Sequence, residues 1–184
     1  ERAMHAGCVA LDTEFVWTRT YYPRLGLVQV GLSGEECFLV DGIEIRDLSP
    51  LGRLLADPTV VKILHDAQQD LTILRRVTGS FPRNVFDTRC AAGFAGLSSF
   101  ISLRDLLREV VEVELDKTES RTDWIQRPLS DRQVAYAIED VRHLPEVRNV
   151  LLSRARQLGL EAWLMEELGE YDDPGLYEER DPRM

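Results

Sequence analysis

The first third of the chain alternates short apolar runs with turn residues, a pattern typical of β-strands. It predicts strands at residues 7–15, 25–32 and 36–41. The Ser33-Gly34 step between the second and third runs indicates a hairpin. We therefore expect these three strands to form an antiparallel meander.

From residue 50 onwards the pattern changes to helices that alternate with short strands. Strands are predicted at 60–64 and 85–86. Helices are predicted at 50–56, 67–77, 88–95, 102–111, 130–143 and 146–158, followed by a helix that runs to Leu168. Strands that alternate with helices favour parallel pairing, so the whole pattern predicts an α/β fold. Its mixed β-sheet would combine the three-strand antiparallel meander with parallel strands, flanked by helices.

Composition restricts the classes of protein to which the chain can belong. The 184 residues are 44% hydrophobic and 29% charged, as in one ordinary globular domain. No apolar run approaches the roughly 18 residues of a membrane span, so no membrane contact is expected. The three cysteines and three histidines are scattered, which argues against a disulfide framework or a zinc site. We expect a cytoplasmic monomer.

The acidic charge is concentrated at the C-terminal end. The net charge is −10, and residues 161–184 alone carry nine acidic and two basic side chains. Residues 1–160 are close to neutral, so the overall charge does not exclude nucleic-acid chemistry in the body. We interpret residues 1–168 as one domain and residues 169–184 as an acidic linker or tail.

Acidic residues in three parts of the chain stand out. Asp12 and Glu14 lie two apart on a strand, so their side chains share a face. Asp70 lies in the first turn of a predicted helix, and Asp140 follows Tyr136 by one i,i+4 step. Four carboxylates from separate elements can hold two divalent cations, and oxygen ligands suit Mg²⁺ or Mn²⁺.

Each of these features also has an ordinary structural interpretation. An Asp-x-Glu pair is common where a strand ends near a turn. An Asp in the first turn usually complements the helix dipole, and Tyr-x-x-x-Asp pairs are frequent on solvated helices. Only the order of these motifs and the sequence around them distinguish a metal site from these ordinary structural interpretations.

That context resembles the ribonuclease D family, within the DEDD group of 3′–5′ exonucleases. The similar segments are Leu11-Asp-Thr-Glu-Phe15, Thr18–Pro23, Leu25–Gln29, Leu64-His-Asp-Ala-Gln-Gln-Asp-Leu71, Leu115–Trp124 and Tyr136-Ala-Ile-Glu-Asp140. The resemblance covers residues 7–160 and includes the tyrosine variety of the last motif. It implies a ribonuclease H-like fold, with the family's downstream helical nucleic-acid-binding domains absent.

The resemblance also implies a set of roles. Asp12, Glu14, Asp70 and Asp140 would bind two divalent cations, Mg²⁺ or Mn²⁺, and Tyr136 would orient the attacking water. The reaction would release nucleoside 5′-monophosphates from RNA 3′ ends, in tRNA maturation or small RNA processing. Candidate substrate contacts are Gln29, Lys117, Arg121 and Trp124.

Two other functions stay open at this stage. Related domains without extra binding modules hydrolyse very short oligonucleotides. The second alternative is a relative that binds RNA or protein without catalysis, although all four carboxylates are present.

Several further residues have local roles. We expect capping boxes at Asp66–Gln69 and at Ser130–Gln133. Tyr21 and Tyr22 are candidates for base stacking, with packing as the alternative. His65 and His143 are interpreted as structural.

Overall fold

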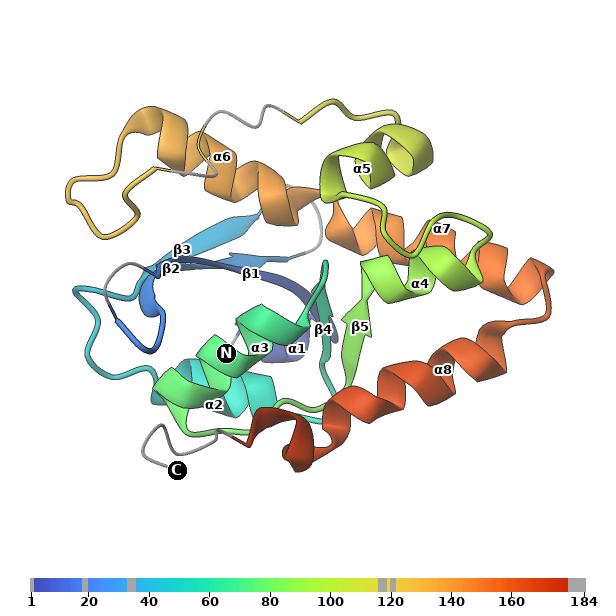
Figure 1. The fold of residues 1–184 in the computed structure, drawn as a ribbon, viewed down its shortest axis with the longest axis horizontal. Coiled ribbons are helices and arrows are strands. Elements are labelled where there is room, and N and C mark those ends of the chain that lie inside the picture. The colour runs from blue at the N-terminus through green and yellow to red at the C-terminus, as the bar shows by residue number, and fades with distance from the viewer. Residues whose placement is uncertain (1, 18–19, 33–35, 116–118, 120–121, 179–184) are drawn as a thin grey trace.

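Five strands form one mixed sheet with helices on both faces in the computed structural model (Figure 1). The structure describes residues 2–17, 20–32, 36–115, 119 and 122–178. The strands are β1 Cys8–Val16, β2 Arg24–Gly31, β3 Cys37–Asp41, β4 Val61–Leu64 and β5 Val85–Asp87. Their order across the sheet is β3-β2-β1-β4-β5, and β1 pairs antiparallel with β2 and parallel with β4. The predicted meander and parallel strands are confirmed.

The helices also agree with the sequence pattern. They are α1 Arg2–His5, α2 Ser49–Ala56, α3 Gln68–Thr78, α4 Thr88–Phe94, α5 Leu103–Val111, α6 Asp131–Arg142, α7 Leu144–Gln157 and α8 Glu161–Gly169. Only the short α1 and two 3-10 helices, Glu170–Asp172 and Pro174–Tyr177, were not predicted. None of the described helices is long and apolar enough to cross a membrane.

Alternate residues of β1 face two separate hydrophobic cores. Val9 and Leu11 pack in the core beneath α2 and α3. Ala10 points to the other face, where α4, α5, α7 and α8 cover the sheet. Because side chains alternate along a strand, Asp12 and Glu14 continue the Ala10 face, and Thr13 continues the Leu11 face.

The sheet has an open edge where these acidic residues lie. β1 pairs with β4 only over Cys8–Ala10, but it remains paired with β2 as far as Val16. The part of β1 beyond Ala10 therefore has no neighbour on the β4 side. Ligands in open α/β sheets bind at such places, beyond the carboxyl ends of the parallel strands.

The segment before α6 is held tightly against β2 and β3. Arg127 donates from Nε and Nη2 to Asp41 at 2.7 and 2.8 Å, and from Nη2 to the Gly26 carbonyl at 2.8 Å. A Cβ atom at Gly26 would collide with the Trp124 carbonyl, so glycine permits this close approach. The predicted Ser130–Gln133 capping box then starts α6, as expected.

The expected acidic linker is wrong for residues 170–177. Tyr177 is only 2% exposed and packs in the core beneath α2 and α3. The Tyr171 hydroxyl donates to Asp87 at 2.6 Å, and Asp172 accepts from the Asn84 backbone N–H at 2.8 Å. Tyrosines therefore fix this segment despite its acidic composition. Residues 179–184 lie outside the described residues.

Asp87 caps the two helices that begin beside it. It accepts hydrogen bonds from the backbone N–H groups of Asp66, Ala67, Arg89 and Cys90, at 2.8–3.3 Å. The predicted capping box at Asp66 is therefore wrong. Asp66 adopts a left-handed backbone conformation, φ 61°, and its side chain forms an ion pair with Arg89.

Asp87→Ala is expected to destabilise the protein by about 2–4 kcal/mol, because it leaves several buried donors without an acceptor. Chemical denaturation measures this loss. Asp57→Ala is the matched control, since the Asp57 side chain accepts from Thr59 in an exposed turn and its backbone carbonyl, which accepts from Lys62, is kept. Equal losses for the two variants would contradict the role of Asp87.

Candidate active site

Three carboxylates converge at the open edge of β1. Asp12 and Glu14 project from β1 towards α6, and Asp140 projects from α6 to meet them. Each offers a carboxylate oxygen, and these oxygens lie within 4.8 Å of one another. Oxygen ligands this close together suit a hard divalent cation.

The fourth carboxylate, that of Asp70, lies on the α3 side of the sheet. Asp70 lies in the first turn of α3 and is 8% exposed. Thr13, which faces α3 rather than α6, donates its hydroxyl hydrogen to Asp70. Asp70 can approach Asp12 because β4 ends before this point. The four predicted carboxylates thus line one cleft, although Asp70 is not part of the close group of three.

The cleft has a volume of about 370 Å³, within the usual range for small-molecule sites. Its lining combines acidic, apolar and neutral polar residues with one arginine. The residues that line it are Asp12, Thr13, Glu14, Phe15, His65, Asp66, Gln69, Asp70, Leu103, Arg104, Leu115, Tyr136, Asp140 and Leu144.

The clustered carboxylates hold protons more tightly than isolated ones. Burial, then the charges of Asp70, Asp140 and Glu14, raise the pKa of Asp12 well above its usual value. Burial and the neighbouring acids raise the pKa of Glu14 to about 9. Burial is also the main cause that raises the pKa of Asp70 to about 7. Such a site favours whatever neutralises it, either protons or cations.

Tyr136 lies one helical turn before Asp140 and lines the same cleft. Burial raises the pKa of its phenol, and so do the charges of Asp140, Glu14 and Asp12 and a hydrogen bond to Asp140. The hydroxyl therefore stays protonated at physiological pH and can donate a hydrogen bond.

Two candidate substrate contacts from the sequence are buried instead. Gln29 is fully buried, lies opposite Asp12 on β2, and donates from Nε2 to Asp12 Oδ2 at 3.3 Å. Trp124 is 1% exposed, and its ring centroid lies 6.0 Å from that of Tyr136. Direct substrate contact is therefore wrong for both, and each supports a cleft residue. Lys117 and Arg121 lie outside the described residues.

Arg104 and Thr13 also line the cleft and were not predicted as site residues. Arg104 of α5 forms an ion pair with Glu114, and a single helical arginine carries no distinguishing sequence signal. Thr13 lies between two motif acids and supports Asp70. His65 lies 3.0 Å from the Thr88 hydroxyl, and burial lowers its pKa, so the ring is neutral.

Comparison with known proteins agrees with this geometry. A 3′–5′ exonuclease family profile matches residues 1–155. The chain belongs to the 3′–5′ exonuclease family. The resemblance to ribonuclease D is also confirmed. Ribonuclease D of Desulfotalea psychrophila is 53% identical over 176 residues, which cover 96% of this chain and 47% of that protein.

Solved structures support the same relationship. Escherichia coli RNase D, described as an exoribonuclease involved in structured RNA processing, superposes with a TM-score of 0.90 at 38% identity. The match covers 98% of this chain and 48% of that one, so the chain spans about half the length of these relatives. Brucella melitensis NrnC with bound Mg²⁺ gives a TM-score of 0.80 at 26% identity, covering 98% and 91%. The family depends on divalent metals, and the acidic cluster is the candidate metal site.

Metal binding to the cluster is expected to release protons and to tighten as pH rises from about 6 to 9, because cations must displace the protons held by Asp70 and Glu14. Mn²⁺ titration calorimetry in buffers of different ionisation enthalpy measures both effects. An affinity that does not change with pH would contradict the raised pKa values.

The raised pKa values also determine how the stability of the metal-free protein changes with pH. These carboxyls bind protons more tightly when folded, so the free energy of unfolding should fall as pH rises from about 4 to about 9. Saturating Mn²⁺ should reverse that fall.

Proposed function

We propose that the chain is the catalytic domain of a two-metal-ion 3′–5′ exoribonuclease that releases nucleoside 5′-monophosphates. The observation that carries the proposal is the group of three carboxylates within 4.8 Å, with Asp70 and Tyr136 on the same cleft. Membership of the exonuclease family supports it.

The four carboxylates would hold two divalent cations, Mg²⁺ or Mn²⁺. Asp12 suits the shared position, because the charges of the other three all act on it. Gln29 orients one Asp12 oxygen, and Thr13 orients Asp70. Such cations, when bound, supply an activated water and stabilise the leaving 3′ oxygen.

The remaining residues of the cleft would position the substrate. Tyr136 donates its hydroxyl hydrogen towards the acidic group and would orient the attacking water. Arg104, which also lines the cleft, would contact the phosphate. The side chains of Leu103 and Leu115 offer an apolar surface to the terminal base.

We propose tRNA precursors and other small structured RNAs as substrates, on the basis of the similarity to ribonuclease D. Short oligonucleotides are the second candidate. One observation favours them: NrnC, also solved bound to pGG, is matched over 91% of its length. A catalytically silent role is less favoured because all four carboxylates share the cleft. A monomeric, cytoplasmic state stays a prediction.

The direct test incubates 5′-labelled single-stranded RNA with Mg²⁺ or Mn²⁺. We expect a ladder that shortens from the 3′ end and that disappears when a chelator is added. A 3′-phosphate should slow cleavage, and a circular RNA should resist it, because the reaction starts at a free 3′ end. Efficient cutting of the circle would indicate an endonuclease instead.

Asp12→Asn is expected to abolish cleavage while the fold persists, because it removes a ligand from the centre of the cluster. It also removes one repelling charge, so the metal-free variant should unfold at an equal or higher temperature. The control is Asp131→Asn, at an exposed position of α6. Near-normal turnover by Asp12→Asn would overturn the mechanism.

Tyr136→Phe is expected to lower the cleavage rate by about 10–10³-fold with Mn²⁺ affinity largely retained, because the ring still packs on Trp124 but the hydroxyl is lost. Single-turnover kinetics and Mn²⁺ titration separate the two effects. An unchanged rate would reduce Tyr136 to a packing role.

A further inference from the structure

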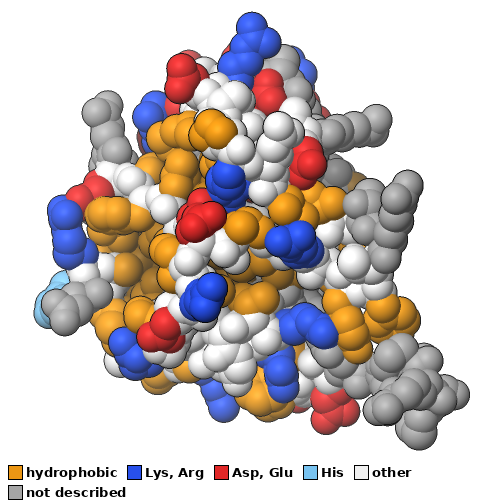
Figure 2. Space-filling view, turned by 90° about the vertical axis from the view of Figure 1, so that its left-hand side faces the viewer, with side chains coloured by type: hydrophobic (Ala, Val, Ile, Leu, Met, Phe, Trp, Pro, Cys, Tyr) orange, Lys and Arg blue, Asp and Glu red, His pale blue; other side chains and the backbone are white. Residues whose placement is uncertain are grey.

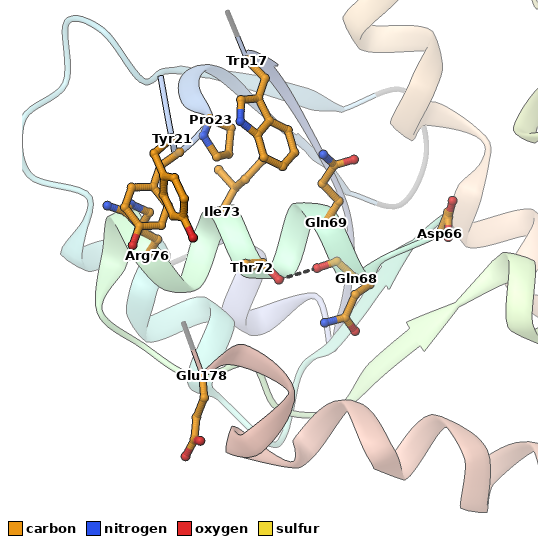
Figure 3. A pocket seen from close by; sticks show the side chains of 11 residues that line it. Trp17, Tyr21, Pro23, Asp66, Gln68, Gln69, Thr72, Ile73, Arg76 and Glu178 are labelled. Atoms are coloured by element: carbon orange, nitrogen blue, oxygen red, sulfur yellow. Dashed lines mark hydrogen bonds between the residues drawn. The ribbon is translucent and has the colours of Figure 1, made fainter. Parts of the chain in front are cut away.

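A second concavity, of about 620 Å³, lies beside the carboxylate cleft (Figure 3). One wall is formed by Trp17 and by residues 21–23 before β2, and the other is a single face of α3. The aromatic groove, as we name it, is formed by Trp17, Tyr21, Pro23, Gln69, Ile73 and Arg76. The three α3 residues are spaced i, i+4 and i+7, so the groove follows the helix axis.

Two aromatic side chains of this groove are exposed. Trp17 is 56% exposed and Tyr21 is 61% exposed. Figure 3 shows the Trp17 indole and Pro23 above Ile73, with the Tyr21 ring further along α3. Neighbouring exposed aromatics on an otherwise well-packed domain indicate a binding surface.

Tyr21 is held in place although it is exposed. The guanidinium carbon of Arg76 lies 3.2 Å from the centroid of the Tyr22 ring. Tyr22 in turn meets Tyr21 edge-to-face, with centroids 4.7 Å apart and an interplanar angle of 83°. Tyr21 therefore offers a ring that needs little ordering when a flat ligand stacks on it.

The groove continues directly into the carboxylate cleft. Asp66 and Gln69 line both cavities. Asp70, the next residue along α3, lines the cleft. A chain with its end among the carboxylates would therefore pass the start of α3 and enter the groove.

The net charge of the chain is −10, and the charged side chains that line the groove are one basic residue, Arg76, and two acidic residues, Asp66 and Glu178. Among the acids that line it, Asp66 is paired with Arg89, and Glu178 lies on the far side of α3 from the aromatic rings (Figure 3). Figure 2 shows this side of the molecule, where basic side chains are spread among hydrophobic ones.

We propose that the aromatic groove binds the nucleotides upstream of the scissile 3′ phosphodiester of a single-stranded RNA. Bases stack on Trp17 and Tyr21, and Arg76 keeps Tyr22 in place against Tyr21. Stacking tolerates any base, so the groove adds affinity without sequence preference. The inference rests on the proposed function, because the cleft defines which end of the RNA enters.

A binding experiment tests the groove without cleavage. The Asp12→Asn protein is titrated with oligouridylates of two and eight nucleotides while tryptophan fluorescence is recorded. We expect the octamer to quench emission, and Trp17→Phe to remove most of that quenching. Trp163→Phe is the control, since Trp163 is 68% exposed but lies on α8. Quenching that persists in Trp17→Phe, or no octamer binding, would overturn the proposal.

Affinity and kinetics provide the second readout. Trp17→Ala and Tyr21→Ala should each weaken octamer binding by about 5- to 100-fold, and Tyr21→Phe should restore it. In the active protein, the ratio of kcat/KM for the octamer to that for the dinucleotide should fall by a similar factor. Both residues are exposed, so thermal unfolding should show an intact fold.

The outcomes separate the two proposals. If the active protein degrades no RNA but the octamer still quenches Trp17, the proposed function fails and the groove remains a nucleic-acid site. If it degrades RNA and the length ratio is the same in all variants, the groove proposal fails and the function stands. If neither oligonucleotide binds, the inference is refuted, and the groove would then have a peptide or protein as its ligand.

Discussion

Four carboxylates in one partly buried cleft repel one another, and the surrounding structure has to hold them there. Burial is the largest cause of the raised pKa of Asp12, Glu14 and Asp70. Repulsion by the other carboxylates of the cleft adds to it for Asp12 and Glu14, and repulsion by Asp66 and Asp87 adds to it for Asp70. The restraint comes from neutral donors: Gln29 bonds to Asp12, and Thr13 bonds to Asp70. A neutral donor orients a carboxylate without neutralising it, so the charge remains for a cation.

The open edge of β1 makes this cluster possible. Because β4 ends early, Asp70 can approach from the α3 face while Asp140 approaches from the α6 face. The start of α3 depends on Asp87, which accepts from the backbone of Asp66 and Ala67. Asp87 in turn receives the Tyr171 hydroxyl from the last described segment. The position of Asp70 is therefore coupled to packing far from the cleft in sequence.

Local patterns predicted most of the fold. Strand alternation and helical periodicity placed every strand and nearly every helix, because each depends on residues close together in the sequence. The shared position of Asp12, Glu14, Asp70 and Asp140 was predicted from the resemblance to ribonuclease D, since each acidic motif alone also has an ordinary structural interpretation.

The errors all involve contacts between distant segments. The donor groups at Asp66 and Ala67 are capped by Asp87, twenty residues away, which no local pattern shows. Trp124 fills the space above Gly26, so its burial follows from a close approach between segments about one hundred residues apart. Gln29 was expected to contact substrate, but its role as a donor to Asp12 could have been predicted, since it lies within an apolar strand directly opposite Asp12 in the meander.

An acidic chain can bind an anionic polymer if cations and uncharged contacts supply the binding energy. Without cations the cleft repels phosphate, so binding of metal and binding of RNA should support each other. Aromatic stacking does not depend on bound metal, because a base contacts Trp17 or Tyr21 through its uncharged face. Few arginines are then needed, and the dependence of RNA binding on salt should be shallow, at about 0.7 per phosphate contacted. Under the proposed function, RNA would therefore be held by cations at its 3′ end and by aromatic rings upstream.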